Sequence, residues 1–163
     1  MMKGREEAAQ YKQMFGINIP GQTIADRLAL KAQMSTIYAS YRPFGSSMLM
    51  CCHDSMSGPT LWMIEPSGAC YQYYGCASGR GRQLCRNEIE KVNYRELTVQ
   101  QAIPKIAKVL LKAQEELKDK KQELELSVMC EDTKWTHKIL DRQTTDQLTA
   151  AALAEIEAEE DEQ

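Results

Sequence analysis

The segment between Gly45 and Cys76 constrains the fold most strongly, because it holds three short strand-like runs separated by turn residues. The runs are SSMLMCCH (46–53), TLWMIE (60–65) and ACYQYYGC (69–76). In the second turn, Pro66 presets the first backbone angle and Gly68 relieves the exit. The spacing predicts a meander of antiparallel strands. The first two runs are apolar on nearly both faces, so we expect cover on both sides and at least three layers.

Two helices are predicted ahead of the meander. Residues 5–15 have the pattern of the last turns of a helix, which Gly16 stops. A second helix is predicted over Thr23–Tyr41, with Thr23 and Asp26 as a cap-like pair and Pro43 as its end. Its apolar residues are spaced to form one helical face, namely Leu30, Met34, Ile37, Tyr38 and Tyr41.

Two more helices are predicted after the meander. Residues 83–92 align Cys85, Ile89 and Val92 on one side. Thr98 and Gln101 then form a capping box that opens a longer helix, Thr98–Lys118. We expect Pro104, inside its second turn, to remove a hydrogen bond and kink it. The expected apolar face is Ile103, Ile106, Ala107, Leu110, Gln114 and Leu117.

The remaining pattern is two strands and one helix. Residues 123–131 alternate strictly, which predicts a strand, and residues 134–140 are expected to pair with it across a short turn. A last helix is predicted from about Thr145 to Glu160, with Leu148, Ala152 and Ile156 facing inward. Helices arrive in pairs and strands in runs, which indicates an α+β protein rather than a βαβ-wound one.

Charge and hydropathy exclude two classes of partner. The net charge is −3, and the last nine residues, EIEAEEDEQ, hold six carboxylates and no cation. We expect this end to be a solvated, frayed helix tail, with a docking role as the alternative. No basic stripe suited to nucleic acid is visible, and no apolar run approaches a membrane span. The N-terminal MMKGREEAAQYKQ is neither a signal nor a transit peptide, so we expect a protein of the cytoplasm and nucleus.

The glycine-rich segment 75–83 raises the question of phosphate binding. Gly75, Gly79 and Gly81 precede a predicted helix, and a helix start can hold an anion. The segment lacks both the Gly-Lys-Ser/Thr ending of a P-loop and the GxGxxG of a dinucleotide loop. Close packing of a strand against a helix explains the glycines equally well, and we prefer that interpretation.

Neither the cysteines nor the histidines form a motif with clear chemistry. None of the six cysteines forms a CxxC pair, so we expect free buried thiols and no metal. His53 with Asp54, and one other histidine at 137, give too few metal ligands, and His137 is expected on a strand face. Cys52 and His53 are strand neighbours that point to opposite faces, which excludes a nucleophile–base pair. We expect no cofactor.

Three strings together resemble the α-type subunits of the proteasome core particle. They are YRPFGSSMLMCCHD (41–54), LWMIEPSGACYQYYGCASGRGRQLCRNEIEK (61–91) and ELELSV (123–128). The resemblance runs from about Arg5 to the C-terminus, and FGINIPG (15–21) and the acidic tail point to type three. The motif residues that carry it are Arg42, Pro43, Gly45, Pro66, Gly68, Gly75, Gly79 and Gly81.

The resemblance implies a fold and a missing segment. The family fold is the N-terminal-nucleophile hydrolase sandwich of helices, two sheets and helices (αββα). Family members carry a long further segment ahead of Arg5, with several strands, the gate-forming tail and the start of the first helix. The chain would then be a truncated product, an alternative start or a partial gene model. We expect residues 1–154 to be a partial α-subunit domain, residues 155–163 to be an acidic tail, and the isolated chain to be poorly stable.

The resemblance also implies a function. It predicts a non-catalytic subunit of the outer ring that binds other α subunits laterally, β subunits axially and regulatory particles through the ring. The expected β-facing residues are Tyr11, Met14, Phe15 and Ile17. One alternative is an active threonine-type hydrolase of the same fold, which needs an N-terminal Thr, Ser or Cys where this chain has Met-Met. The other is a free-standing binding or regulatory module.

Overall fold

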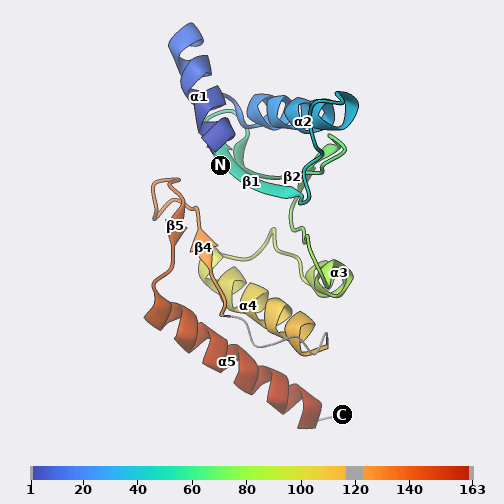
Figure 1. Cartoon of the computed structure of the whole chain (residues 1–163). Helices are drawn as coiled ribbons and strands as arrows, with labels where there is room; N and C mark the ends of the chain where they lie inside the picture. Colours follow the sequence, from blue (N-terminus) through green and yellow to red (C-terminus); the bar gives the residue numbers. More distant parts are fainter. Residues whose placement is uncertain (1, 117–122, 162–163) are drawn as a thin grey trace. The chain divides into compact units, whose positions relative to one another are not determined.

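The computed structural model describes residues 2–116 and 123–161 (Figure 1). It divides into a first unit, residues 1–74, and a second unit, residues 75–163, which are described separately. The elements in chain order are α1 (Met2–Phe15), α2 (Gly21–Ile37), β1 (Met48–Asp54), β2 (Gly58–Ile64), β3 (Cys70–Tyr73), α3 (Arg82–Glu90), α4 (Val99–Glu116), β4 (Ser127–Val128), β5 (Lys138–Ile139) and α5 (Arg142–Asp161). Helices and antiparallel strands in this order confirm a mixed α and β chain.

Helix α1 ends where the sequence predicts. Gly16 has φ +74°, and its N–H donates to the carbonyl of Lys12 at 2.9 Å. This left-handed residue closes the last turn at little steric cost. Glu7 ties α1 to α2 through ion pairs with Arg27, at 3.2 Å, and Lys31.

Helix α2 is displaced toward the N-terminus from its predicted position. It begins at Gly21 after Pro20, and the Gly21 N–H donates to Asp54 Oδ2 at 3.1 Å. The predicted pair of Thr23 and Asp26 is therefore wrong as the cap, because a carboxylate from β1 satisfies the helix start. The predicted end was also wrong, since Tyr38 is already extended (φ −85°, ψ 124°) well before Pro43.

The three-stranded sheet confirms the predicted meander, in the order β1-β2-β3. Met48 to Asp54 pair residue by residue with Ile64 to Gly58, without a bulge. In the second turn, the Gly68 N–H donates to Glu65 O at 2.9 Å, and Glu65 N–H donates to Ala69 O at 2.8 Å. Gly68 has φ +91°, as the turn requires.

Gly68 also permits close packing against α2. A Cβ at this position would lie 2.6 Å from Gln33 Cβ and 3.1 Å from the Ala29 carbonyl oxygen. The absence of a side chain therefore lets the β2–β3 turn approach the helix backbone.

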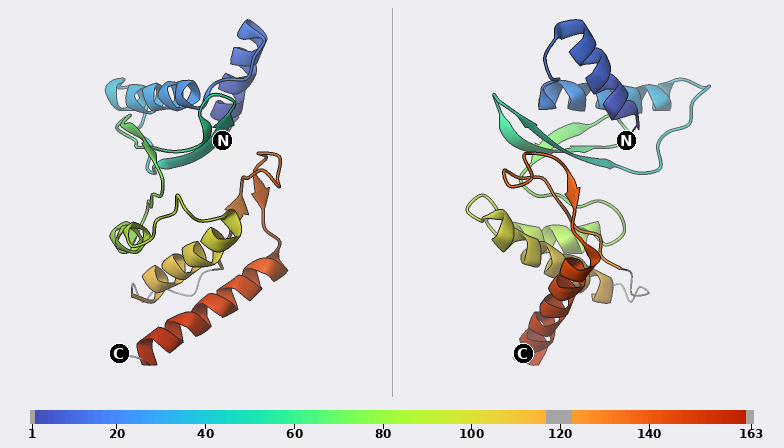
Figure 2. Two further views of the ribbon diagram at one scale, coloured as in Figure 1. Left: turned by 180° about the vertical axis from the view of Figure 1, so that it is seen from behind. Right: turned by 90° about the vertical axis from the view of Figure 1, so that its left-hand side faces the viewer.

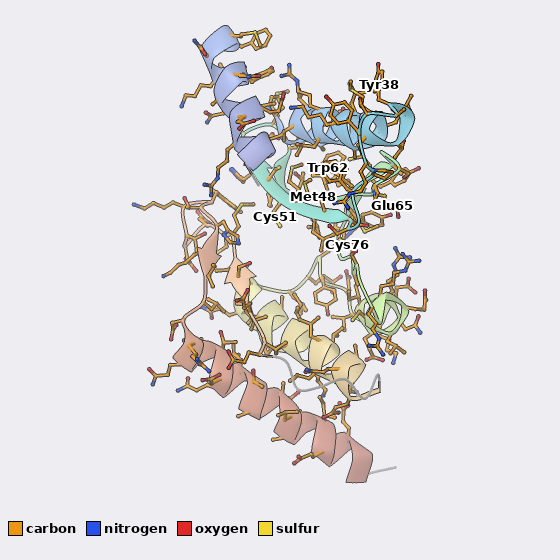
Figure 3. All side chains as sticks on the ribbon, viewed as in Figure 1. Tyr38, Met48, Cys51, Trp62, Glu65 and Cys76 are labelled. Atoms are coloured by element: carbon orange, nitrogen blue, oxygen red, sulfur yellow. The ribbon has the colours of Figure 1, made fainter. Side chains whose placement is uncertain are left out.

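Helix α2 covers one face of the sheet. Ile64, only 2% exposed, packs with Leu28, Ala29 and Ala32. Figure 3 shows Trp62 between the sheet and α2, and Cys51 on the opposite side. Within the first unit, the described residues place no helix on that second face. Our expectation of buried thiols was wrong for Cys51, which is exposed, and only Cys85 is fully buried among the cysteines described.

In the second unit, a helix-to-helix core joins α3 and α4. Cys85 packs with Val109 and Ala113. Gly81, with φ +77°, precedes α3, and a Cβ at Gly75 would lie 2.7 Å from Ile89 Cγ2. The preferred interpretation of the three glycines, close packing, agrees with this geometry at Gly75. It is wrong for Gly79, where a Cβ would meet nothing within 4 Å and the glycine instead permits a φ of +103°.

Helix α4 starts at the predicted capping box. The Thr98 N–H donates to Gln101 Oε1 at 3.0 Å, and the Gln101 N–H donates to Thr98 Oγ1 at 3.4 Å. The helix continues through Pro104. The predicted apolar face was only partly right: Ala107 is buried, but Ile106 and Leu110 are exposed. Val109 faces α3 and Leu111 faces α5, so two different sides of the helix are buried. Leu117 and Lys118 lie outside the described residues.

The second sheet is shorter than predicted. Only Ser127 and Val128 pair with Ile139 and Lys138. A long turn with Lys134 (φ +52°) and Trp135 (φ +56°) replaces the short predicted one, because these left-handed residues leave the extended conformation. His137 lies in the connection before β5, so its placement on a strand face was wrong.

Helix α5 begins at Arg142, where the Asp141 carboxylate accepts the Thr144 N–H at 3.1 Å. Ala152 and Ile156 pack against Leu111 of α4, as predicted for two of the three inward residues. The boundary expected between residues 154 and 155 falls within this helix. Among the described helices, none has the length and hydropathy needed to span a membrane.

Candidate interaction surface

The predicted interface residues gather at the C-terminal end of α1 and in the loop that follows. Met14, Phe15 and Ile17 are between 56% and 65% exposed. Tyr11 is half-buried, because its ring lies 4.5 Å from that of Phe15 and the Arg27 guanidinium carbon lies 5.3 Å from its centroid. Tyr11 therefore supports Phe15 against α2 and leaves its neighbours available for contact.

A second exposed group lies on α2, which we call the α2 stripe. Its members are Leu30, Met34 and Ile37 on the helix, and Tyr38 and Tyr41 beyond the helix end. Each of these side chains is between 41% and 67% exposed. Figure 3 shows Tyr38 pointing away from the sheet. In both views of Figure 2, α1 and α2 lie on the same side of the three-stranded sheet. The chain thus carries apolar side chains on the outside of this helical pair.

The sequence shows the α2 stripe as apolar but does not show that it faces outward. The buried side of α2 is a second row of mostly small residues, Gly21, Ala25, Leu28, Ala29, Ala32 and Ser35. Small residues let a helix lie close on a sheet whose own side chains fill the space. The signal that identifies the outward face is this row of small residues at helical spacing.

The second face of the sheet is also apolar. Cross-strand pairing aligns Leu49 with Met63 and Tyr71 on the side away from α2. Leu49 and Tyr71 are exposed. An exposed apolar patch of this kind normally marks a surface that another molecule or element covers.

The motif residues that carry the family resemblance lie in three connections between helices and strands. Arg42, Pro43 and Gly45 lie in the exposed connection between α2 and β1, and Pro66 and Gly68 lie in the β2–β3 turn. Gly75, Gly79 and Gly81 lie ahead of α3. The Arg82 N–H donates to the Gly79 carbonyl at 3.3 Å, so one amide of this helix start is already used internally.

The two neighbouring thiols of β1, Cys51 and Cys52, are not activated as nucleophiles. Burial raises the pKa of Cys52 to about 11, with the neighbouring Cys51 and Asp54 adding to the effect. Partial desolvation against the sheet also raises the pKa of Cys51, although this side chain is exposed at the surface. Both thiols stay protonated at neutral pH and are poor nucleophiles. Over residues 2–116 and 123–161, no group of three His, Cys, Asp or Glu side chains could hold a metal.

Comparison with known proteins identifies the family. Residues 1–129 match the proteasome subunit family. The chain is 39% identical over 159 residues to proteasome subunit alpha type-3 of Acanthamoeba castellanii, covering 98% of this chain and 63% of the relative. It is 37% identical over 155 residues to proteasome subunit alpha type-3 of Spinacia oleracea, covering 95% and 62%.

A probable proteasome subunit alpha type-7 of Saccharomyces cerevisiae is 37% identical over 163 residues, covering 98% of this chain and 56% of the relative. The chain therefore spans about three-fifths of the length of the curated relatives it matches. Because the family match covers most of its residues, the chain belongs to the proteasome subunit family.

Proposed function

We propose that the chain is a non-catalytic subunit of the outer α ring of the proteasome core particle. In this role it supports ring assembly, restricts the access of substrate and serves ubiquitin-dependent protein degradation. Its partners are other α subunits laterally, β subunits axially and regulatory particles through the ring, in cytoplasm and nucleus. Similarity to α-type subunits over nearly the whole chain supports the proposal.

We also propose that the working fold is the αββα sandwich. The sheet of the first unit has α2 on one face and an exposed apolar patch at Leu49 and Tyr71 on the other. Two stacked sheets bury such faces against each other. In the proposed fold a second sheet covers the patch.

The proposed assembly role depends on one observation, the exposure of large apolar side chains in the α2 stripe and at the end of α1. Side chains of this size rarely gather on the surface of a chain that works alone. Exposed Met, Tyr and Phe side chains are typical of the centre of protein interfaces. We propose that Met14, Phe15 and Ile17, supported by Tyr11, join the α2 stripe in contacting a β subunit.

Incorporation into the particle tests the proposal. The tagged chain is expressed in its source cells, and lysate is separated on a glycerol gradient. Mass spectrometry then quantifies α and β subunits that co-purify with the tag. We expect the chain in the fractions of the full particle, with subunits of both rings at comparable amounts. Recovery of the chain only in light fractions would contradict the assembly role and favour the free-standing module.

A matched pair of substitutions tests the surface. Met34→Glu places a charge in the α2 stripe, whereas Met56→Glu places one at a turn residue that is 93% exposed. A charge at the centre of an apolar interface costs binding, while a charge at an isolated exposed position costs little. We expect Met34→Glu to reduce incorporation strongly and Met56→Glu to preserve it. Equal incorporation would exclude the α2 stripe as the contact.

The hydrolase alternative predicts a different outcome. A threonine-type hydrolase of this fold would cleave a fluorogenic peptide by itself. We expect no turnover by the purified chain. Turnover that persists after removal of co-purifying particles would favour the enzyme.

A further inference from the structure

The C-terminal turns of α5 differ from the rest of the helix in what holds them to α4. Ala152 and Ile156 pack against Leu111, and Ile156 is only 3% exposed. Beyond Ile156, the side chains described up to Glu159 are exposed. Apolar burial therefore ends one turn before the described helix does.

Two lysines of α4 hold the turns that follow. Lys108 Nζ lies 3.3 Å from a Glu155 oxygen and 2.6 Å from a Glu159 oxygen. Lys112 Nζ lies 2.7 Å from the other Glu159 oxygen. The lysines are one turn apart on α4 and the glutamates one turn apart on α5, so their ion pairs join two facing rows. Figure 1 shows α4 and α5 side by side.

Lys108 and Glu159 both stay charged at neutral pH. Hydrogen bonds from Lys108 and Lys112 lower the pKa of Glu159 to about 2. Hydrogen bonding to Glu159 raises the pKa of Lys108. Lys108 is the centre of the cluster, since its side chain is only 18% exposed and contacts both glutamates.

We propose that the last turns of α5 form a charge-operated latch on α4. The latch is closed at low ionic strength and detaches locally when salt screens the cluster or when Lys108 loses its charge. The apolar row through Ile156 keeps the remainder of α5 in place. The latch thereby sets whether the carboxylates of Glu155 and Glu159 are held by α4 or released to solvent.

The expected effect is modest and measurable. Exposed ion pairs contribute little individually and are weakened by salt. Three pairs that share two lysines together change the local opening equilibrium by roughly tenfold. A change of that size is readily resolved by amide hydrogen exchange.

The test is hydrogen exchange of the full 163-residue chain at low and high sodium chloride. A synthetic peptide of residues 153–163 corrects for the effect of salt on intrinsic exchange. Lys108→Gln is compared with Lys105→Gln, which removes the same charge from an exposed residue of α4 that pairs with no described residue.

We expect salt to speed exchange of amides 156–161 about tenfold in the wild type, and in Lys105→Gln. Lys108→Gln is expected to exchange fast at low salt and to lose most of the salt response. Three results would overturn the latch: no salt response in the wild type, an unchanged response in Lys108→Gln, or simultaneous loss of protection in amides 105–113 of α4. The last result would show global rather than local opening.

Discussion

Replacing Gly68 by alanine tests how closely the β2–β3 turn packs on α2. Gly68 and Gly58 both have positive φ, +91° and +68°. Alanine therefore costs about 1–2 kcal/mol of backbone strain at either position. Only at Gly68 does the new methyl group also meet other atoms, 2.6 Å from Gln33 Cβ and 3.1 Å from Ala29 O.

Those atoms cannot yield without moving α2, because one belongs to the backbone and the other is bonded directly to it. Overpacking of this kind costs about 1–3 kcal/mol more. We therefore expect Gly68→Ala to lose roughly 2–5 kcal/mol of unfolding free energy and Gly58→Ala about 1–2 kcal/mol. The difference between the two variants, about 1–3 kcal/mol, isolates the packing contribution.

The assay is urea unfolding followed by the fluorescence of Trp62. Its indole N–H donates to Thr60 Oγ1 at 3.1 Å, so it reports on the first unit. A Trp135→Phe background removes the other tryptophan, and trimethylamine N-oxide in all samples favours the folded state. Equal unfolding midpoints for the two alanine variants would refute close packing at Gly68.

Three further predictions concern single contacts. Asp54→Asn is expected to destabilise the chain at neutral pH, because backbone N–H donors of Ser57 and Gly21 lower the pKa of the Asp54 carboxyl below its ordinary 3.8. The stabilisation from this carboxylate is therefore present above pH 3.8 and is lost as the pH falls below that value. Thermal unfolding at several pH values measures it. Thr98→Ala removes half of the capping box and is expected to cost about 1 kcal/mol in chemical unfolding, whereas an unchanged midpoint would argue against the cap. Disulfide-exchange labelling at neutral pH is expected to modify exposed Cys51 before Cys52, and the reverse order would contradict the assigned strand faces.

Local chemistry explains why part of the fold is predictable from the sequence. The capping box of α4, the Pro66–Gly68 turn and the stop at Gly16 each depend on residues within a few positions of one another. Such features form wherever their residues occur, because the hydrogen bonds close within the segment. The burial of Ala152 and Ile156 follows from helical spacing alone.

The incorrect predictions depend on contacts distant in sequence. Asp54 caps α2 from 33 residues away, which no local pattern indicates. The α2 stripe is apolar, but it is the row containing Ala25 and Ala29 that packs against the sheet. Small residues in this row let the helix backbone approach the sheet closely. Residues 123–128 alternate in burial as a strand does. Within that segment only Ser127 and Val128 pair, because the partner segment leaves the extended conformation at Lys134.

The candidate surface was predictable in part for the same reason. Met14 and Phe15 are the last residues of α1 and Ile17 follows the glycine that ends it, and their exposure agrees with a contact role. Their assignment to a β subunit stays a prediction. The outward direction of the α2 stripe could be found only once the opposite side of the helix was seen to lie on the sheet.

Methionine oxidation most directly tests the claim that the outer side of α1 and α2 exists to contact sister subunits. Hydrogen peroxide oxidises exposed methionines, and peptide mass spectrometry follows Met14, Met34 and Met56 in the free chain and in purified particles. The account predicts that assembly protects Met14 and Met34 while Met56, at the β1–β2 turn, stays reactive. Oxidation of Met14 and Met34 at the free-chain rate within the particle would contradict it.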